Sequence, residues 1–189
     1  KITLDNGVVG WGETIPNYTW AKVPEKIDER IVGKQAGDLL WQDGLGAGVQ
    51  MALFDAVGKT LGVPAYSLLG DKVREWCPLS WWGMDMPSAD WARQCADAVK
   101  QGYASAKLKA RTWYDLHDAI GAILKVVPEQ FKLDLDFNGT LADAASAVEF
   151  LKTLERYEQV AMIESPIPQG DVIGNRHIRD RINRPLAMH

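Results

Sequence analysis

Apolar residues follow one pattern in about the first 70 residues of the chain and another in the rest. Two strand-like runs within residues 1–13 flank the turn-forming pair Asn6-Gly7, which predicts a β-hairpin. A polar, irregular stretch extends from there to about residue 44. Apolar residues then recur at helical spacing from Leu45 to Val57, so we predict a helix there and a short helical turn at 65–69.

Strands and helices are predicted to alternate regularly from residue 77 onward. The predicted strands are residues 77–82, 104–110, 131–137 and 160–164, with a fifth that begins at Pro185. The predicted helices are residues 89–101, residues 115–127, a third with Thr140 as its N-cap and an apolar face reaching Leu154, and a fourth at 173–182. The alternation repeats about every 28 residues, which predicts consecutive βαβ units and a parallel sheet. A (β/α)8 barrel and an open doubly wound sheet both fit, but no dinucleotide glycine fingerprint follows a strand.

The composition narrows the class of protein. The chain has 189 residues, a formal charge of −4 and 47% hydrophobic residues, which is enough to build a sizeable core. This mildly acidic balance gives no reason to expect nucleic acid or an anionic membrane as a partner. No run of about 18 apolar residues suggests a membrane span. Cys77 and Cys95 lack metal-type spacing, so we interpret them as reduced thiols of a cytoplasmic protein.

Both ends of the sequence lie inside predicted structure. Lys1 is neither a Met nor the start of a signal peptide, and it already belongs to the hairpin. About four and a half βα units cannot close an eight-stranded barrel. We therefore expect the natural protein to continue well beyond residue 189.

The segment 131–144 resembles the opening of a calcium-binding loop, because Asp134, Asp136 and Asn138 alternate before a glycine. An EF-hand loop also needs a carboxylate at its twelfth position, which is Ala145 here, and a helix before it, where we predict a strand. Two requirements fail, so we exclude an EF-hand. In an extended chain the alternating acids point to one face and the apolar residues to the other.

Polar residues that could act in catalysis stand at the carboxyl ends of the predicted strands. They are Lys107 and Lys109, Asp136 and Asn138, Glu164, and His189. In a barrel these strand ends meet at one mouth, where the active sites of this fold lie. Two carboxylates beside an amide form an oxygen-rich site that suits Mg²⁺ or Mn²⁺ rather than Zn²⁺. The neighbouring lysines should have a lowered pKa beside such a cation, which would make one of them a usable base.

Each of these residues also has an ordinary structural interpretation. A Lys-x-Lys pair is commonly a solvated strand face, and Asp-x-Asn after a strand is commonly a turn. The aromatic residues Trp81, Trp82 and Tyr114 either line the pocket or pack in the core. Only the ordered combination favours a functional site.

The ordered motifs resemble the enolase superfamily, in its mandelate racemase/muconate lactonising enzyme branch. The motifs are Gly10-Trp-Gly-Glu13, the run from Met51 to Pro64, Leu68-Leu-Gly70, Lys107-Leu-Lys109, Asp136-Phe-Asn138, Ile163-Glu-Ser-Pro166 and Arg184-Pro-Leu-Ala-Met188. The resemblance implies an α/β protein: part of an α+β capping domain at residues 1–75, and the first half of a (β/α)8 TIM-type barrel at residues 76–189.

The resemblance also implies roles for the strand-end residues. Asp136 and Glu164 match metal ligands, and Lys109 matches the catalytic base. Lys107 matches a lysine near the substrate carboxylate, and Asn138 matches a residue beside the metal. The third metal ligand would follow His189, which differs from the acidic residue common at its position and would lie near the substrate.

The implied function is the Mg²⁺-dependent removal of the proton α to a carboxylate, giving an enediolate. The outcome would be racemisation or epimerisation, dehydration of an acid sugar, or cycloisomerisation of a small carboxylate, in a full-length homo-oligomer. Two alternatives stay open. One is a Schiff-base lyase on the same barrel that uses Lys107 or Lys109, and the other is a non-catalytic barrel relative that binds an acidic ligand.

Overall fold

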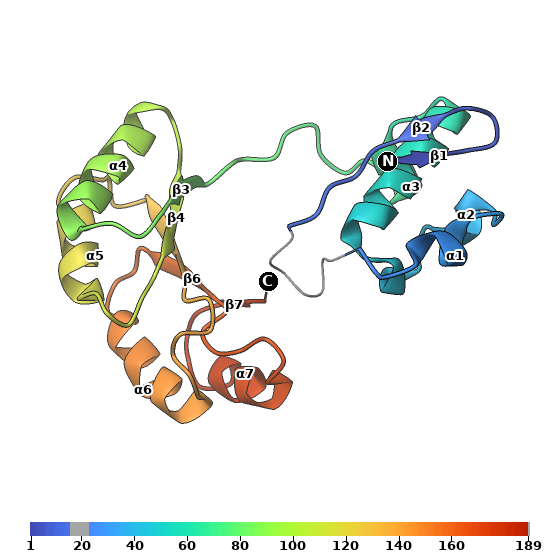
Figure 1. Cartoon of the computed structure of the whole chain (residues 1–189). Coiled ribbons are helices and arrows are strands. Elements are labelled where there is room, and N and C mark those ends of the chain that lie inside the picture. Colours follow the sequence, from blue (N-terminus) through green and yellow to red (C-terminus); the bar gives the residue numbers. More distant parts are fainter. Residues whose placement is uncertain (16–22, 189) are drawn as a thin grey trace. The chain divides into compact units, whose positions relative to one another are not determined.

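A parallel sheet organises the C-terminal part of the computed structural model, which describes residues 1–15 and 23–188 (Figure 1). Its strands are β3 (Trp81–Gly83), β4 (Ser105–Lys109), β5 (Lys132–Asp136), β6 (Val160–Glu164) and β7 (Leu186–Ala187). They pair in chain order, and every neighbouring pair is parallel. The intervening helices are α4 (Ser88–Lys100), α5 (Leu116–Leu124), α6 (Ala144–Leu154) and α7 (Val172–Arg179), and they lie on one side of the curved sheet. This confirms the predicted βα units of a partial barrel.

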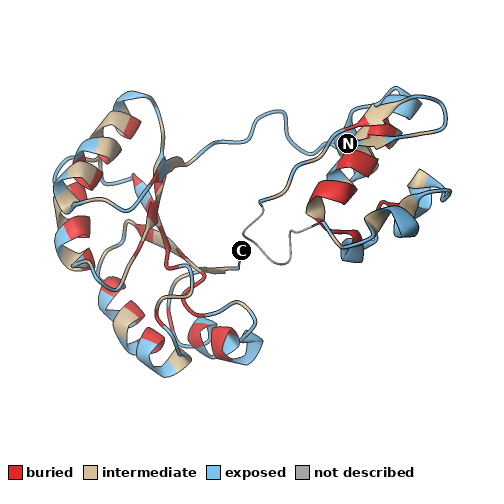
Figure 2. Cartoon of the chain, in the orientation of Figure 1, coloured by how far each residue is buried: buried red, intermediate tan, exposed pale blue. Residues whose placement is uncertain are grey.

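The hydrophobic core of this sheet lies on the side that faces the helices (Figure 2). Leu108 of β4 and Leu133 and Leu135 of β5 are fully buried, and they meet Trp91 of α4 and Ile120 of α5 in one cluster. Because side chains alternate along a strand, the residues between these leucines point to the opposite face. The acids of β5 and the lysines of β4 therefore share the face that no helix of this unit covers.

The chain divides into two compact units, Lys1–Trp76 and Cys77–His189. In the N-terminal unit, β1 (Ile2–Thr3) and β2 (Val9–Gly10) form the expected antiparallel hairpin around Asn6-Gly7. The long helix α3 (Ala47–Leu61) packs against β2 and is followed by a short 3-10 helix, Ala65–Leu68. A hollow of about 720 Å³ in this unit is bordered by β1, α1 (Ile27–Ile31), α2 (Ala36–Leu39) and α3, and none of the predicted site residues that the structure describes lines it.

The two glycines of the Gly10-Trp-Gly12 motif have a packing role. A Cβ atom on Gly10 would lie 2.0 Å from the carbonyl oxygen of Ala52 in α3. A Cβ atom on Gly12 would lie 2.1 Å from the carbonyl oxygen of Gly48. Only glycine allows the hairpin to approach the helix backbone this closely.

Three sequence predictions about elements were wrong in detail. The stretch to residue 44 is not wholly irregular, because it contains α1 (Ile27–Ile31) and α2 (Ala36–Leu39). The first strand of the sheet is Trp81–Gly83, and residues 77–80 precede it without strand structure. The N-cap of α6 is Asp143 rather than Thr140, whose hydroxyl donates to the carbonyl of Phe137 instead.

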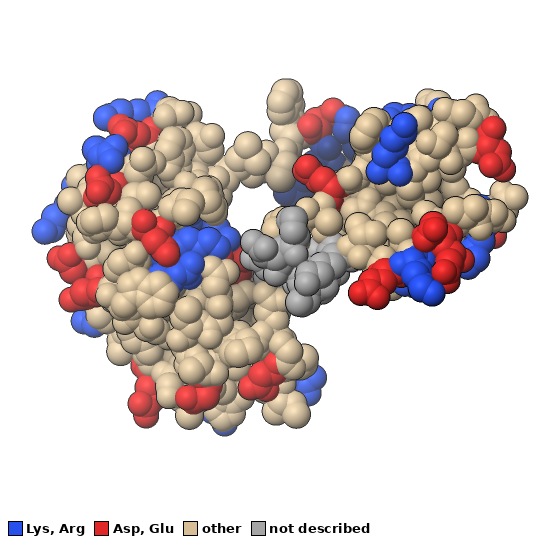
Figure 3. All heavy atoms as spheres, viewed as in Figure 1, with Lys and Arg blue, Asp and Glu red and all other residues tan. Residues whose placement is uncertain are grey.

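Charged side chains of both signs are interspersed on the face of the molecule shown in Figure 3. Some charged residues form ion pairs with a residue three or four positions away on the same helix, such as Asp90 with Arg93 and Asp97 with Lys100. Within the described residues, no helix has the length and apolar character needed to cross a membrane. Cys77 is exposed, Cys95 is buried, and both are free thiols.

Candidate active site

Strand register brings the predicted site residues side by side. Lys109 pairs with Asp136 across β4 and β5, and Asp136 pairs with Glu164 across β5 and β6. All three lie at the carboxyl ends of their strands, on the face opposite the core. The alignment depends on a register shift beside Leu133, after which Asp134 pairs with Met162 and one residue of β6 is skipped.

Asp136 is the centre of the cluster and is fully buried, with 0% of its side chain exposed. One of its oxygens, Oδ2, lies 2.8 Å from the ammonium of Lys107 and 2.6 Å from that of Lys109. Lys107 also lies 3.2 Å from Oε2 of Glu164, and Lys109 donates to Oδ1 of Asn138 at 3.0 Å. The two lysines therefore share one carboxylate and diverge toward different second partners.

The carboxylates set the protonation of Lys107. Burial lowers the pKa of Lys107, but hydrogen bonds and charge from Asp136 and Glu164 outweigh it, so that its pKa lies above the ordinary value. The lowered lysine pKa predicted from the sequence applies to a lysine beside a bound cation, and it stays a prediction. Burial raises the pKa of Asp136, but its bonds from Lys107, Lys109 and the Asn138 backbone N–H bring it below the ordinary value.

Asn138 begins a left-handed turn directly after β5. Its φ is 48° and that of Gly139 is 80°, a region that Asn and Gly enter more readily than other residues. This turn lets the backbone N–H of Asn138 donate to Oδ1 of Asp136 at 2.9 Å. Both oxygens of the buried carboxylate are therefore held, one by the lysines and one by the turn.

Two charged residues near this cluster had no role assigned from the sequence. Arg111 donates from Nη2 to Oδ1 of Asn138 at 2.9 Å, and the same alternation that pairs Lys107 with Lys109 could have pointed to it. Asp134 lies one pleat below Asp136, and burial followed by the charge of Glu164 raises its pKa. Asp134 is part of the calcium-like spacing in the sequence, but that pattern predicted no function for it.

The structure separates the aromatic residues whose placement was left open. The indole N–H of Trp81 donates to Gln94 of α4, and its ring packs edge-on against Tyr103. Tyr114 packs against the ring of Trp91, also in α4. Trp82 alternates with Trp81 and is 55% exposed, in register with Lys107. Of the three, only Trp82 remains a candidate for lining the site.

The donor set fits two ligands of an oxygen-seeking divalent cation. The ammonium of Lys107 lies within 3.2 Å of both carboxylates, so the side chains of Asp136 and Glu164 can face one positive charge together. Carboxylate oxygens suit Mg²⁺ or Mn²⁺. Among residues 1–15 and 23–188, no three His, Cys, Asp or Glu side chains are grouped so as to hold a metal. His189 lies outside the described residues.

Comparison with known proteins covers most of the chain. The profile of the family described as "Enolase C-terminal domain-like" matches residues 90–189. A D-galactonate dehydratase of Variovorax paradoxus is 31% identical over an alignment 197 residues long. The alignment covers 88% of this chain and 51% of the relative. The chain thus spans about half the length of the curated relatives it matches.

Solved structures share the fold over nearly the whole chain. The N-succinyl Arg/Lys racemase of Bacillus cereus has a TM-score of 0.82 at 22% identity, covering 98% of this chain and 56% of that one. A dipeptide epimerase of Enterococcus faecalis, solved in complex with Mg and the dipeptide L-Leu-L-Tyr, has a TM-score of 0.80 at 21% identity and covers 99% and 58%. These likenesses support the same arrangement of βα units.

Proposed function

Because the chain belongs to the enolase superfamily, with a C-terminal domain of the mandelate racemase/muconate lactonising type, we propose that it serves in the Mg²⁺-dependent removal of the proton α to a carboxylate. The observation that carries this proposal is the buried carboxylate of Asp136, shared by Lys107 and Lys109 beside Glu164. These groups stand at the carboxyl ends of three adjacent parallel strands, where barrel enzymes carry their chemistry.

Asp136 and Glu164 would hold the cation in this proposal. Bound there, Mg²⁺ would hold the substrate carboxylate and stabilise the negative charge that develops as the proton leaves. The backbone N–H of Asn138 keeps the Asp136 carboxylate oriented. One of the two proposed ligands is thereby fixed before a substrate arrives, which is what electrostatic stabilisation requires.

The two lysines would have different roles in the reaction. Lys109, nearer the end of β4, would take the α-proton as the general base. Lys107 would place its positive charge beside the substrate carboxylate. Its ion pairs with Asp136 and Glu164, at 2.8 and 3.2 Å, support this role, because they favour the charged ammonium. The same ion pairs disfavour a Schiff-base lyase acting through Lys107, since such a lysine must be neutral to attack.

The outcome after proton removal differs among the relatives. Their names include a dehydratase, a racemase and an epimerase, and all three reactions are consistent with loss of a proton next to a carboxylate. We propose a small-molecule carboxylate as the substrate, with dehydration, racemisation or epimerisation, and cycloisomerisation as the possible outcomes. Residues 1–75 would be part of the capping domain and residues 76–189 the first half of the barrel, which the two compact units support.

Exchange of the α-hydrogen with deuterium in heavy water tests the proposal. The whole chain, with Mg²⁺, is incubated with D-galactonate, N-succinyl-L-lysine and L-Leu-L-Tyr, and exchange is followed by NMR. If one of them exchanges, Lys109→Ala should slow the reaction by about 10²- to 10⁴-fold, the usual contribution of a positioned base. Both enantiomers of the active compound are tested, because a second base on the opposite face could still exchange one of them.

Calorimetry with Mg²⁺ supplies the controls for this experiment. Lys109→Ala should still bind Mg²⁺, whereas Asp136→Ala and Glu164→Ala should each bind it far more weakly. Lys100→Ala, an exposed lysine of α4, should change neither property. Exchange of both enantiomers at the wild-type rate by Lys109→Ala would show that Lys109 is not the base. Carboxylate binding without any exchange would instead favour the non-catalytic alternative.

A further inference from the structure

Arg111 follows the end of β4 and makes contacts with all three nitrogens of its guanidinium. Nη2 donates to Oδ1 of Asn138 at 2.9 Å. Nη1 donates to the backbone carbonyls of Ala110 and Asp136 at 3.2 and 3.3 Å. Nε lies 3.3 Å from Oδ1 of Asp85, and only 11% of the Arg111 side chain is exposed. The guanidinium is therefore committed to protein acceptors.

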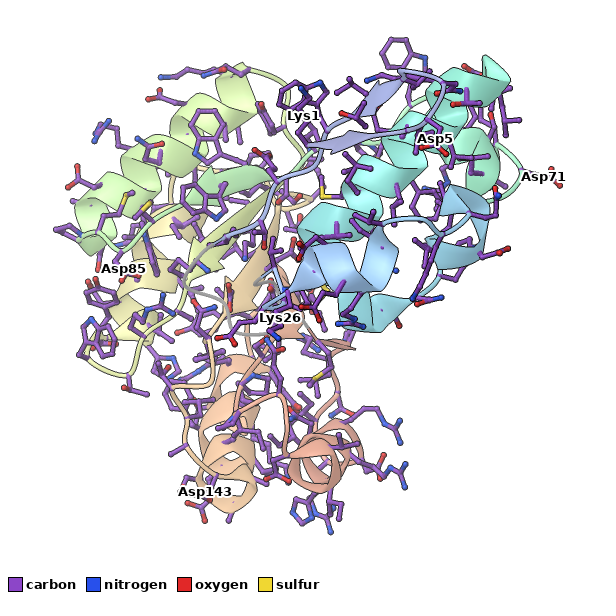
Figure 4. The ribbon with its side chains drawn as sticks, turned by 45° about the vertical axis from the view of Figure 1, so that its right-hand side comes forward. Lys1, Asp5, Lys26, Asp71, Asp85 and Asp143 are labelled. Carbon is purple, nitrogen blue, oxygen red and sulfur yellow. The ribbon has the colours of Figure 1, made fainter. Side chains whose placement is uncertain are left out.

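These contacts join three parts of the sheet at its carboxyl end. Asp85 lies on the segment between β3 and α4 (Figure 4), Arg111 follows β4, and Asn138 follows β5. The ring of Trp113 lies 5.9 Å from the guanidinium carbon and covers it further. Because the fork of an arginine is planar and rigid, this network sets where Asn138 can place its side chain. Arg111 is thus suited to act through another residue rather than on a ligand directly.

The carboxamide of Asn138 is held through its oxygen. Oδ1 accepts from Lys109 at 3.0 Å and from Arg111 at 2.9 Å. When Lys109 is protonated, both partners are donors with no acceptor atom, so the reverse orientation would set an NH₂ group against two cations. Arg111 stays a donor when Lys109 is neutral, so it imposes the same orientation in both states. The orientation of the amide therefore follows from the charges around it.

The nitrogen of the same carboxamide is available to a ligand. Asn138 is exposed, and no described residue accepts a hydrogen bond from its Nδ2. An anionic ligand beside Asp136 and Glu164 would find a fixed neutral donor there. We infer that Arg111 is a positioning residue, which locks the Asn138 carboxamide with its oxygen toward Lys109 and its NH₂ group available to a ligand carboxylate.

The role of the NH₂ group rests on the proposed function, but the lock itself does not. Its direct test is NMR of the ¹⁵N-labelled whole chain, in which the Asn138 side-chain signal is the one lost in Asn138→Ala. In the wild type this signal should show the heteronuclear NOE of a rigid group. Arg111→Gln should abolish that NOE and speed exchange of the NH₂ protons with water, because Lys109 alone remains to hold the oxygen.

Two further variants keep this test decisive. Asp85→Asn removes the ion pair of Arg111 but leaves all the groups of the Asn138 contact. It should therefore reduce the heteronuclear NOE of the Asn138 NH₂ group, but less than Arg111→Gln does. It also serves if Arg111→Gln fails to fold. Arg93→Gln removes an exposed arginine that pairs with Asp90 on α4, and it should leave the signal unchanged. An unaltered Asn138 signal in folded Arg111→Gln, or in Asp85→Asn if Arg111→Gln does not fold, overturns the inference.

A double-mutant cycle tests whether Arg111 acts through Asn138 once a substrate is found. Misplacing a group by about 1 Å can slow catalysis by about 10²-fold, so we expect Arg111→Gln to slow α-hydrogen exchange on that scale. The double variant Arg111→Gln/Asn138→Ala should be no slower than Asn138→Ala alone. Losses that multiply would mean that Arg111 acts independently and would overturn the inference. If no carboxylate exchanges, the proposed function fails, and the NMR result still decides the role of Arg111.

Discussion

At the scale of single residues, the site depends on how a fully buried carboxylate is compensated. Asp136 is shielded from water but accepts from Lys107, Lys109 and the backbone N–H of Asn138. A buried charge is tolerated only with such partners, since leaving it unpaired costs several kcal/mol, on the order of 3 to 5. Asp134, one pleat away, has a weaker set of partners and faces the charge of Glu164.

Asp134→Asn should raise the thermal stability of the chain at neutral pH. Burial and the charge of Glu164 raise the pKa of Asp134, so the native state binds its proton more tightly than the unfolded state. The unfavourable contribution is absent below the ordinary aspartate pKa of about 3.9 and develops as the pH rises through the folded value. Melting temperatures measured with EDTA should therefore show a gain at pH 7 that vanishes toward pH 3.

Glu129→Gln is the matched control for this substitution, because Glu129 is an exposed acid outside the sheet. It should change the melting temperature little at either pH. If Asp134→Asn lowered the melting temperature at pH 7, then the charge of Asp134 stabilises the fold through Lys107 and the assigned cause is wrong.

At the scale of elements, three successive helices begin in the same way. Asp115, Asp143 and Asp171 are the N-caps of α5, α6 and α7, and each accepts hydrogen bonds from backbone N–H groups of the first turn. These N–H groups have no partner within the helix. A carboxylate also suits the positive end of the helix dipole. The caps fix where each helix starts after its strand, and therefore how long each loop at the carboxyl edge of the sheet can be.

Asp143→Ala should lower the melting temperature by a few degrees. Asp143, labelled in Figure 4, lies at the start of α6. It accepts from the N–H groups of Ala145 and Ser146 at 2.9 and 3.0 Å, and both would lose their partner. Thr140→Ala is the matched control, because the Thr140 hydroxyl bonds to the Phe137 carbonyl and caps nothing. A larger loss in Thr140→Ala than in Asp143→Ala would contradict this assignment of the cap.

At the scale of the whole molecule, the sheet has two unpaired edges within the described residues. β3 pairs only with β4, and β7 pairs only with β6. An exposed strand edge is a template for pairing with another chain unless charges or bulges block it. The expected homo-oligomer of the natural protein is a separate proposal, but the same edges should affect the behaviour of this chain.

We predict that a protein of these 189 residues self-associates as its concentration rises. Sedimentation velocity over a series of concentrations should show species heavier than the 21.0 kDa monomer. Ala187→Lys places a charge on the β7 edge and should weaken the association. A monomer at every concentration would show that the unpaired edges of β3 and β7 do not drive association, and it would contradict this prediction.

Much of the fold follows from the sequence alone, because side-chain alternation and helical spacing are local properties. Leu133 and Leu135 had to face the core and Asp134 and Asp136 the other side, since a strand has a period of two. The parallel pairing of the strands and the position of polar residues at strand ends followed from the repeat. The order of the strands did not, because the repeat fits both a barrel and an open doubly wound sheet. The short helices α1 and α2 did not, because four or five residues carry too little periodicity to be recognised.

Only the tertiary structure decided which groups meet. Unbroken pairing of β5 with β6 would have set Ile163 opposite Asp136, and the skipped residue in β6 sets Glu164 there instead. Such a bulge depends on packing between strands, and no local sequence pattern predicts it. The same holds for Arg111, whose side-chain partners Asp85 and Asn138 lie 26 and 27 residues away in sequence. Local sequence determined which side of the strand each side chain takes, while register and rotamer, which depend on contacts across strands, determined the network of charges.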